Sequence, residues 1–420
     1  MSIRTAGVVT ALALALAASG CGSGGDRPQT STSAAATTAG VAGKLVIWGD
    51  DKRAAALKPF ADKFGQENGV TVEVQAISKD QQTTFVTAAQ QGSGPDVMVG
   101  AHDWIGNLVQ NGAIDPVQLT AAQQQGIAPN ALQAVTFNGQ VYAVPYATEN
   151  LALIRNTKLA PQAPATIEDL VKTGKKLKAE KKAAEILCLQ VGQNGDAYHS
   201  YPLFTSAGGY LFGTDAAGGY DKNDLGVGKP ESIAAFAKIR ALGEKGDGAL
   251  KRSITMENSI ATFTAGKCAY LISGPWAVTD AKKAKIAYDI SPVPGFAGGK
   301  PAQPFLGVQS FYVAARGKNK ALAQEFVTNY VTTPELAVAL YQAEPRPPAL
   351  TAAFDQVKGA DPDLAKWIEA GKHAVPLPAI PEMATIWDPF GKAESAVIGG
   401  ADPKTALTAA AKTISGQIKP

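Results

Sequence analysis

Two apolar, strand-like segments near the start of the chain are each followed by side chains that could bind a polar ligand. These side chains are Asp51 and Lys52 after the first segment and Asp103 and Trp104 after the second. Ionised carboxylates accept several hydrogen bonds, an amine donates them, and an indole ring covers an apolar face. The combination suits a sugar, which has hydroxyls around its rim and C–H groups on its faces. Asp51 and Asp103 could instead cap the helices that follow them, because aspartate is a preferred N-cap residue.

The segments around these residues predict a parallel β-sheet. Apolar runs typical of buried strands occupy 44–48 and 96–100, and alternating valines at 70–74 predict a further strand between them. Helical stretches separate the three segments. In the first helical stretch, apolar residues recur at i, i+3, i+4 and i+7 from Leu57 to Phe64. A β-α-β-α-β order favours a parallel sheet with helices on its faces, which is an α/β fold. Ligands of such sheets bind beyond the carboxyl ends of the strands, where the four side chains above would meet.

The second half of the chain contributes two further aromatic candidates. The apolar run 268–272 predicts a strand that ends close to Trp276, whose ring could be a platform for a ligand or part of the core. Trp387 stands at the start of a predicted helix, after the proline-rich segment 376–381, which we expect to be irregular. Asp402, followed by a proline, marks the start of the last helix.

The first twenty residues resemble a secretion signal and are not part of the predicted fold. Arg4 precedes the apolar run 6–18, which is shorter than the ~20 residues of a membrane-spanning helix. Small residues before Cys21 resemble a bacterial lipobox, which implies a lipid on that cysteine; an ordinary signal peptide with an incidental cysteine is the alternative. Residues 22–43 are mostly Gly, Ser, Thr and Ala and predict a flexible tether. We therefore expect an extracytoplasmic protein, anchored to the outer face of the cytoplasmic membrane.

Composition narrows the class of protein further. About 375 residues follow the tether, which is enough for two domains. A net charge of +3 without a long Lys/Arg run argues against a nucleic-acid partner. The three histidines stand apart from the cysteines in the sequence, so we expect neither a metal nor another cofactor. Cys188 and Cys268 could be free core cysteines or form a disulfide, and the sequence leaves both possibilities open.

Six segments in order resemble the bacterial maltose/maltodextrin-binding proteins, which are extracellular solute-binding proteins of family 1 and substrate-binding lipoproteins of ABC transporters. The segments are 44–52, 94–103, 145–156, 208–210, 274–276 and 381–387. The resemblance implies a periplasmic-binding-protein type II fold, in which two α/β lobes hold the ligand in the cleft between them. It also implies a monomeric binding protein without catalytic residues, whose partners are maltose or a short maltodextrin and an ABC permease.

The resemblance further implies that the chain crosses between the lobes more than once. We place the crossings near Glu149, near 294–300 and near 345–350, where a proline cluster suits a connector. The predicted N-terminal lobe comprises 44–149 and 300–345, and the predicted C-terminal lobe comprises 150–299 and 346–420.

The sugar contacts of this family carry over to eight residues of the chain. They are Asp51, Lys52, Asp103 and Glu149 in the first lobe, and Asp196, Tyr198, Trp276 and Trp387 in the second. Several positions depart from the family pattern: Asp196 replaces a glutamate, Gly100 an aromatic residue, Trp104 and Gly391 arginines, and Met256 a tyrosine. We expect the Trp104 ring to substitute for the one missing at Gly100. The departures leave the length and linkage of the sugar open.

Two other functions remain as alternatives. The same fold could bind trehalose, a different oligosaccharide or a solute that is not a sugar. A secreted glycoside hydrolase would need an acid and a nucleophile or base on either side of the scissile bond. Asp51, Asp103 and Glu149 instead map to hydroxyl-binding positions of one lobe, so we expect a binding protein and no enzyme.

Overall fold

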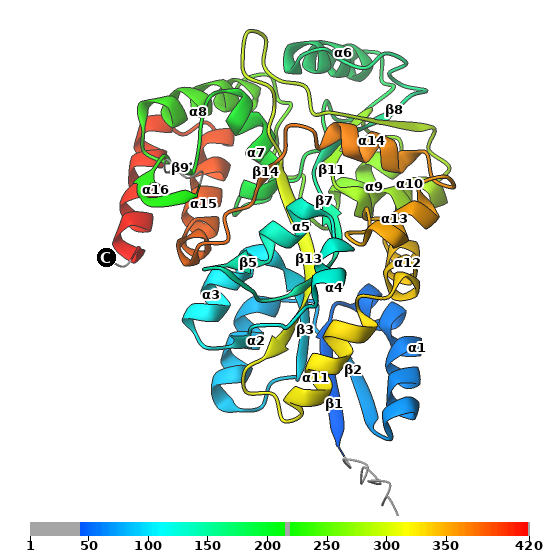
Figure 1. Cartoon of the computed structure of the whole chain (residues 1–420). Coiled ribbons are helices and arrows are strands. Elements are labelled where there is room, and N and C mark those ends of the chain that lie inside the picture. The colour runs from blue at the N-terminus through cyan, green and yellow to red at the C-terminus, as the bar shows by residue number, and fades with distance from the viewer. Residues whose placement is uncertain (1–42, 215–218, 419–420) are drawn as a thin grey trace, which may run out of the picture. The chain divides into compact units, whose positions relative to one another are not determined.

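The computed structural model describes residues 43–214 and 219–418. The predicted signal peptide, the lipobox cysteine Cys21 and nearly all of the tether lie outside the described residues. The described chain contains two main β-sheets, each with its own helices and core (Figure 1).

The first sheet, here the large sheet, has seven strands. They are β1 (Lys44–Gly49), β2 (Thr71–Ala76), β3 (Val97–Ala101), β4 (Ile114–Asp115), β7 (Val144–Glu149), β13 (Phe305–Ala314) and β14 (Val375–Pro376). Strand β1 pairs in parallel with both β2 and β3, as the sequence predicted. Strand β13 is antiparallel to β3 and β7 and parallel to β14, so the sheet is mixed. Pro376 fits this ladder because the N–H groups of Val375 and Leu377 make the hydrogen bonds on either side of it, and the expectation of wholly irregular structure at 376–381 was wrong there.

Both faces of the large sheet are covered by helices. The helices are α1 (Asp51–Asn68), α2 (Gln81–Gln91), α3 (Ile105–Gln110), α4 (Ala121–Gln125), α5 (Pro129–Ala134), α11 (Lys320–Glu325), α12 (Pro334–Ala343) and α13 (Thr351–Val357). Shorter elements are the 3₁₀ turn η1 (His102–Trp104), the π turn η3 (Phe326–Tyr330) and the hairpin of β5 (Thr136–Phe137) and β6 (Gln140–Val141). Leu45 and Ile47 of β1 enter one core and Trp48 enters the other, as the alternation of a pleated strand requires.

The second sheet, here the small sheet, is antiparallel and has the order β11-β8-β12. Its strands are β8 (Ala152–Asn156), β11 (Tyr270–Ser273) and β12 (Tyr288–Ser291), and β9 (Phe212–Thr214) and β10 (Tyr220–Leu225) form a separate hairpin. The helices around it are α6 (Ile167–Ala179), α7 (Ala197–Ser206), α8 (Pro230–Leu242), α9 (Ser259–Thr264), α10 (Val278–Lys283), α14 (Asp363–Ala370), α15 (Trp387–Ile398) and α16 (Pro403–Gln417). Two 3₁₀ turns, η2 (Pro275–Ala277) and η4 (Pro381–Thr385), precede α10 and α15.

Local sequence signals explain where several of these helices begin. Asp402 caps α16, since its carboxylate accepts a hydrogen bond from the Thr405 N–H at 2.8 Å, as predicted. Helix α1 is capped by Asp50, which accepts from the Arg53 N–H at 2.9 Å, and not by Asp51. The alternative role of Asp51 as an N-cap is therefore wrong, and Asp51 is instead the first residue of the helix.

The chain passes from the large sheet to the small sheet between β7 and β8, directly after Glu149. Strand β13 also joins the two cores, because Phe305 packs with the residues around the small sheet and Phe311 packs with those of the large sheet. Later in the chain, Ala353 of α13 packs on the large-sheet core and Trp367 of α14 on the small-sheet core. The division into lobes stays a prediction.

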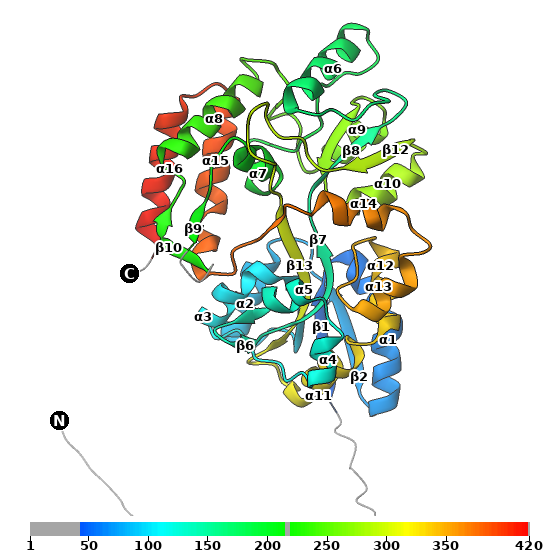
Figure 2. The same ribbon diagram turned by 45° about the horizontal axis from the view of Figure 1, so that its top comes forward.

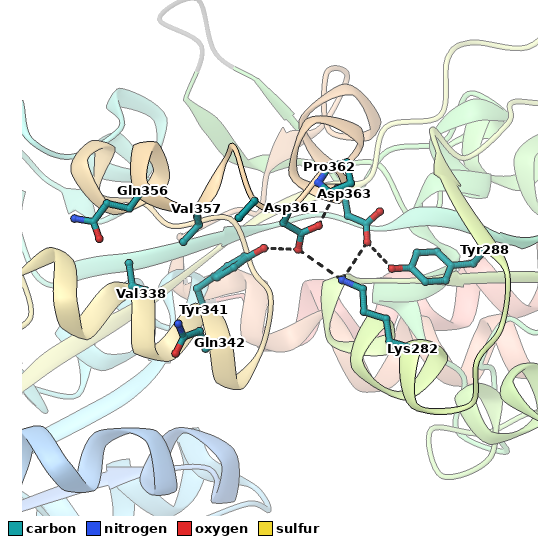
Figure 3. Close-up of a pocket in the computed structure, with 11 residues that line it drawn as sticks. Lys282, Tyr288, Val338, Tyr341, Gln342, Gln356, Val357, Asp361, Pro362 and Asp363 are labelled. Carbon is teal, nitrogen blue, oxygen red and sulfur yellow. Dashed lines mark hydrogen bonds and ion pairs between the residues drawn. The ribbon is translucent and has the colours of Figure 1, made fainter.

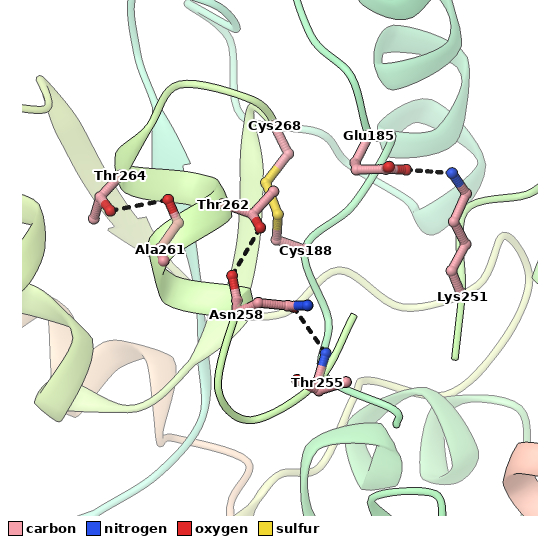
Figure 4. Close-up of a disulfide and its surroundings, with 9 residues drawn as sticks. All are labelled: Glu185, Cys188, Lys251, Thr255, Asn258, Ala261, Thr262, Thr264 and Cys268. Atoms are coloured by element: carbon pink, nitrogen blue, oxygen red, sulfur yellow. Dashed lines mark hydrogen bonds and ion pairs between the residues drawn. A yellow bond between two sulfur atoms is a disulfide. The ribbon is translucent and has the colours of Figure 1, made fainter. Parts of the chain in front are cut away.

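A disulfide lies beside the small sheet, where the sequence left the state of the cysteines open. Cys188 and Cys268 are bonded, with their Cα atoms 6.2 Å apart, and both are fully buried (Figure 4). The bond joins the segment after α6 to the start of β11 and closes a sequence separation of 80 residues. Asn258 lies close by and fixes the turn before α9 by accepting a hydrogen bond from the Thr255 N–H at 2.9 Å.

Candidate functional site

A pocket of about 970 Å³ collects four of the residues that the sequence predicted for sugar binding. Those four are Asp103, Trp104, Tyr198 and Trp387. One wall comes from α2, η1 and α3 of the large sheet, and the other from α7, η4 and α15. Helices α2, α3, α7 and α15 are labelled in Figure 2. Asp103 and Trp104 follow the carboxyl end of β3, where the α/β fold places its ligand.

His102 fixes the turn that presents Asp103 and Trp104. Its imidazole is buried: Nδ1 accepts a hydrogen bond from the Val308 N–H at 3.1 Å, and Nε2 lies 3.2 Å from the Leu377 carbonyl oxygen. Burial lowers the pKa of His102 to about 4, so the ring is neutral and Nε2–H donates to Leu377. The turn is therefore tied to β13 and to the segment that follows β14.

The Asp103 carboxylate stands in the pocket in a desolvated position. Burial raises the pKa of Asp103 to about 7, and the negative charge of Glu149 adds to that effect. Near neutral pH this group therefore changes between a carboxylate that only accepts hydrogen bonds and an acid that also donates one. Its charge would be favoured by any ligand that donates hydroxyl hydrogens to it.

The Trp104 indole lies over Gly100. A Cβ atom at Gly100 would stand only 2.1 Å from the Trp104 ring, so the ring fills the space that a side chain at position 100 would need. Trp104 also lines the pocket. The Trp104 ring thus occupies the space of the side chain missing at position 100, and its contact with a sugar stays a prediction.

Tyr198 and Trp387 enter the pocket from the other wall and share one packing partner. The Phe305 ring lies 6.0 Å from the Tyr198 ring and 6.3 Å from the Trp387 ring. The Tyr198 hydroxyl is buried and has no hydrogen-bond partner among the described residues. Burial raises the pKa of Tyr198 well above its ordinary value, with the Glu149 charge as a further cause, so the hydroxyl keeps its proton. It is therefore a donor and acceptor without a partner, buried behind the surface of the pocket wall.

Glu149 belongs to a buried network of charges beside the pocket. Its Oε1 accepts from Gln309 Nε2 at 2.9 Å, and its Oε2 pairs with Nε of Arg346. Arg346 also pairs with Glu344, which in turn accepts from Lys52 Nζ at 3.1 Å. Two predicted sugar contacts, Glu149 and Lys52, therefore already have partners within the protein.

Trp276 lies next to this network and not in the wall of the large pocket. The Arg346 guanidinium sits over the Trp276 ring, 5.4 Å from its centroid, and the imidazole of His199 approaches the same ring edge-on at 6.1 Å. Trp276 is half-buried, and its indole also covers Gly274. Asp51 lies apart from both groups, exposed on the first turn of α1.

Asp196 is held by the protein at the start of α7. One carboxylate oxygen accepts from the N–H of His199 at 2.9 Å and lies 3.0 Å from its Nδ1, and the other accepts from Gln190. Burial acts to raise the pKa of Asp196, but His199 and these hydrogen bonds lower it on balance, so the group is ionised. Asp196 is thus the N-cap of the helix that carries Tyr198.

Two glycines allow the Asp196 loop to approach α15. A Cβ atom at Gly195 would stand 1.8 Å from the Gly391 carbonyl oxygen, and Gly195 has a left-handed φ of 76°. The Asp196 N–H donates to the fully buried Glu394 of the same helix at 2.9 Å. The glycine at 391 therefore has a packing reason, because α15 meets the loop backbone there.

A second pocket, of about 710 Å³, lies away from the predicted residues (Figure 3). The Lys282 amine lies between the carboxylates of Asp361 and Asp363, at 3.7 and 3.4 Å. Tyr341 of α12 donates to Asp361 at 2.5 Å, and Tyr288 of β12 donates to Asp363. These pairs connect helices of the large sheet with elements of the small sheet.

Several residues that shape the site were not predicted from the sequence. They are Arg346, Gln309, His199, Gln82, Asn107 and Asn111. Arg346 stood in the proline cluster taken as a connector, and only its contact with Glu149, 197 positions away, reveals its role. Asn107 and Asn111 did carry a signal, since they follow Trp104 at i+3 and i+7 on a predicted helix.

Within residues 43–214 and 219–418 no cluster of His, Cys, Asp or Glu could hold a metal ion. A search of the same residues finds no helix that is long and apolar enough to span a membrane.

The chain is similar in sequence to several sugar-binding proteins. The galactooligosaccharide-binding protein of Bacillus subtilis (strain 168) is 29% identical over 395 residues, 92% of each chain. A maltodextrin-binding protein of the same organism is 30% identical over 370 residues, 86% of each chain. The maltotriose-binding protein of Pyrococcus abyssi is 27% identical over 356 residues, 82% of this chain and 75% of the relative.

The model of a protein family described as bacterial extracellular solute-binding proteins matches residues 60–372, well over half of the chain. The mixed α/β architecture is consistent with the periplasmic-binding-protein type II fold of that family, as predicted. Such proteins bind a solute and do not transform it, which agrees with the expectation of no enzyme. The chain therefore belongs to the family of bacterial extracellular solute-binding proteins.

Proposed function

We propose that the protein captures maltose or a short maltodextrin outside the cell and delivers it to an ABC permease. One observation carries the proposal: a single pocket is lined by Asp103, Tyr198, Trp104 and Trp387, and the Tyr198 hydroxyl has no hydrogen-bond partner among the described residues. Relatives named for binding maltodextrin and maltotriose support the choice of sugar.

The chemistry of these groups fits a sugar. The carboxylate of Asp103 accepts hydroxyl hydrogens, and hydrogen bonds to a charged group contribute about 1.5–3 kcal/mol each. A movement of the pocket walls that exposes the buried Tyr198 hydroxyl would let it donate to one sugar hydroxyl and accept from another. The indoles of Trp104 and Trp387 cover the C–H faces of pyranose rings. Micromolar affinity requires about 8 kcal/mol after the costs of ordering, and these contacts suffice for that.

The Glu149–Arg346 network takes a supporting role in this proposal. Glu149 and Lys52 are paired within the protein, so we assign the direct contacts to Asp103, Trp104, Tyr198 and Trp387. Trp276, covered on one side by Arg346, and Asp196, the cap of α7, border the site. Asp51 would contact the sugar only through a movement of α1.

The proposal includes the predicted lobes and the lipid anchor. A sugar that contacts both walls of the pocket stabilises the closed arrangement of the lobes, and the permease recognises that form. The sequence placed the third crossing near 345–350, and we now propose it later, between α13 and α14, because these helices pack on different cores. Cleavage after Gly20 and lipidation of Cys21 would hold the protein at the membrane, since two acyl chains give stable anchoring.

A thermal-shift panel with the mature protein tests the sugar directly. Maltose, maltotriose, trehalose, galactooligosaccharides and diacetylchitobiose would be compared with a non-sugar solute such as glutamate. We expect maltotriose to raise the melting temperature the most. A larger shift with another sugar would replace the named ligand, and a shift only with the non-sugar solute would overturn sugar binding altogether.

Galactooligosaccharides are the second candidate ligand. The similarity to the galactooligosaccharide-binding relative extends over 92% of both chains, whereas the similarity to the maltodextrin-binding relative extends over 86%. The polar groups of the pocket accept hydroxyls of either sugar series, so the linkage decides between them. Mass spectrometry of the sugars after incubation separates both candidates from a glycoside hydrolase, because a binding protein returns the sugar intact.

A further inference from the structure

A group of lysines stands at one end of the small sheet. Strand β8 is antiparallel to β11 and β12, so its last residue lies beside the first residues of both neighbours. Adjacent strands are about 4.8 Å apart, so the three backbones lie within about 10 Å of one another at this end. One lysine stands just beyond the end of each strand: Lys158 after β8, Lys267 before β11 and Lys285 before β12.

A fourth lysine joins this end of the sheet from the turn after α6. The Lys267 carbonyl oxygen accepts hydrogen bonds from the N–H groups of Ala184 at 2.7 Å and of Glu185 at 2.9 Å, which ties the end of that turn to the start of β11. Lys181 lies three residues before Ala184 in the same turn. The four residues Lys158, Lys181, Lys267 and Lys285 are here called the lysine cluster.

The charges of the lysine cluster are not neutralised by the protein. All four side chains are exposed, and none makes an ion pair within residues 43–214 and 219–418. Two neighbouring carboxylates are already paired with other lysines, Glu180 with Lys182 at 2.9 Å and Glu185 with Lys251 at 2.5 Å. The cluster therefore presents its positive charges to the solvent.

Two members of the lysine cluster have backbone conformations that are unfavourable for lysine. Lys181 has a φ of 57° and Lys285 a φ of 55°, both in the left-handed region. Glycine adopts this region freely, whereas a residue with a Cβ atom does so at a cost in free energy. The fold therefore retains a charged residue at two positions where glycine would be less strained.

The lysine cluster is separate from the residues assigned to the sugar. The opposite end of the same sheet is close to them in the chain, since β8 begins three residues after Glu149 and β11 ends three residues before Trp276. The five residues of β8 span about 15 Å. A change in the cluster should therefore leave the sugar pocket intact.

We propose that the lysine cluster docks the protein on anionic phospholipids of the membrane at which its lipid anchor would hold it. The proposal uses the extracytoplasmic location given under the proposed function, but not the sugar site. Lysine ammonium groups attract phosphate headgroups without a fixed geometry, and each one near the surface adds to the attraction. All four lysines lie on turns or bends at the end of the sheet, which suits contact with a flat charged surface. Residues 22–43 can span about 70 Å when extended, enough for this end of the protein to reach the membrane.

Co-sedimentation with lipid vesicles tests the proposal. The mature protein, made without its lipid, would be mixed with vesicles of phosphatidylcholine alone or of phosphatidylcholine with about 30% phosphatidylglycerol. We expect it to bind only the anionic vesicles and to be released by about 0.5 M salt, because salt screens the attraction. Lys158→Gln/Lys267→Gln/Lys285→Gln should bind them at least about tenfold more weakly.

Lys318→Gln/Lys404→Gln/Lys412→Gln is the matched control, because it removes the same charge from exposed positions on other elements. Its binding to the anionic vesicles should stay within about twofold of the wild type. Equal losses in the two triple variants, or no binding of the wild type to anionic vesicles, would overturn the proposal. Binding to polyglutamate but not to vesicles would also overturn it and would assign the cluster to an acidic protein segment.

The same variants separate membrane docking from sugar binding. In titration calorimetry, sugar affinity of the cluster variant should stay within about twofold of the wild type. A protein that binds sugar but no vesicles would refute the docking surface alone. A protein that binds anionic vesicles but no sugar would refute the proposed function and leave the docking surface standing.

Discussion

The protonation of Asp103 should set how sugar binding depends on pH. Burial raises the pKa of this carboxyl to about 7, and hydroxyl donors of a sugar stabilise its ionised form. Below pH 7, sugar binding therefore releases a proton from Asp103. The affinity should be highest above pH 7 and should fall by up to about tenfold per pH unit below it. Titration calorimetry between pH 5 and 8 measures this slope.

Asp103→Asn should bind more weakly and lose the slope, because the amide has no charge to titrate. Asp388→Asn is the control, since Asp388 lines the same pocket but is exposed and paired with Lys392. The same slope in Asp103→Asn as in the wild type would show that another group controls the pH dependence.

The two predicted tryptophan platforms should differ in their contribution. Trp387 lines the large pocket, whereas one side of the Trp276 ring is covered by the Arg346 guanidinium. We expect Trp387→Ala to weaken sugar binding by about 1–3 kcal/mol and Trp276→Ala by less than about 1 kcal/mol. Calorimetry of both variants, with circular dichroism to verify folding, gives the comparison. A larger loss for Trp276 would move the sugar toward Glu149.

At the scale of elements, the approach of the Asp196 loop to α15 depends on a glycine. In Gly195→Ala, the new Cβ atom would stand only 1.8 Å from the Gly391 carbonyl oxygen. The alanine would also have to adopt the left-handed backbone conformation of Gly195. We expect it to lower the free energy of unfolding by about 2 kcal/mol or more. Urea denaturation measures the difference.

Gly192→Ala isolates the backbone strain from the contact. Gly192 belongs to the same loop and has a φ of 69°, but nothing lies within 4 Å of its added Cβ. Its cost should be about 1 kcal/mol. Equal costs for the two substitutions would mean that the packing against Gly391 contributes nothing.

The disulfide should stabilise the protein without shaping the site. Cys188 and Cys268 are buried beside the small sheet and close a separation of 80 residues. Cys188→Ala/Cys268→Ala should lower the free energy of unfolding by about 2–5 kcal/mol, because the unfolded chain gains conformational freedom. Sugar affinity should stay within about twofold. A loss of affinity in the folded variant would contradict this separation of roles.

Local signals predicted much of the architecture at this scale. Alternating apolar runs and the i, i+3, i+4 pattern from Leu57 gave the parallel strands β1, β2 and β3 with their helices, and Asp402 gave the start of α16. The pairing of Val375 with β13 was missed, because a two-residue strand has no periodicity of its own. Neighbouring Asp50 and Asp51 could not be told apart as caps without the backbone geometry.

For the molecule as a whole, the sequence predicted several residues that line the pocket, but it did not predict the residues that pair with the other candidates. Asp103, Trp104, Tyr198 and Trp387 meet as expected, because strand ends and helix starts place them. Arg346 was missed because it pairs with Glu149, 197 positions away in the chain, and no local pattern predicts so distant a contact. The disulfide could not be predicted either, because it requires the two cysteines to lie close together in the fold. Two buried cysteines can equally well be free.

The central claim is that the pocket between α2, α3 and α15 binds an oligosaccharide. Titration calorimetry of maltotriose against the wild type and against the double variant Asp103→Ala/Trp387→Ala tests it most directly. We expect one site with micromolar affinity in the wild type and a loss of at least about a hundredfold in the folded double variant. Equal affinity in both proteins, or no binding of any oligosaccharide by the wild type, would contradict it.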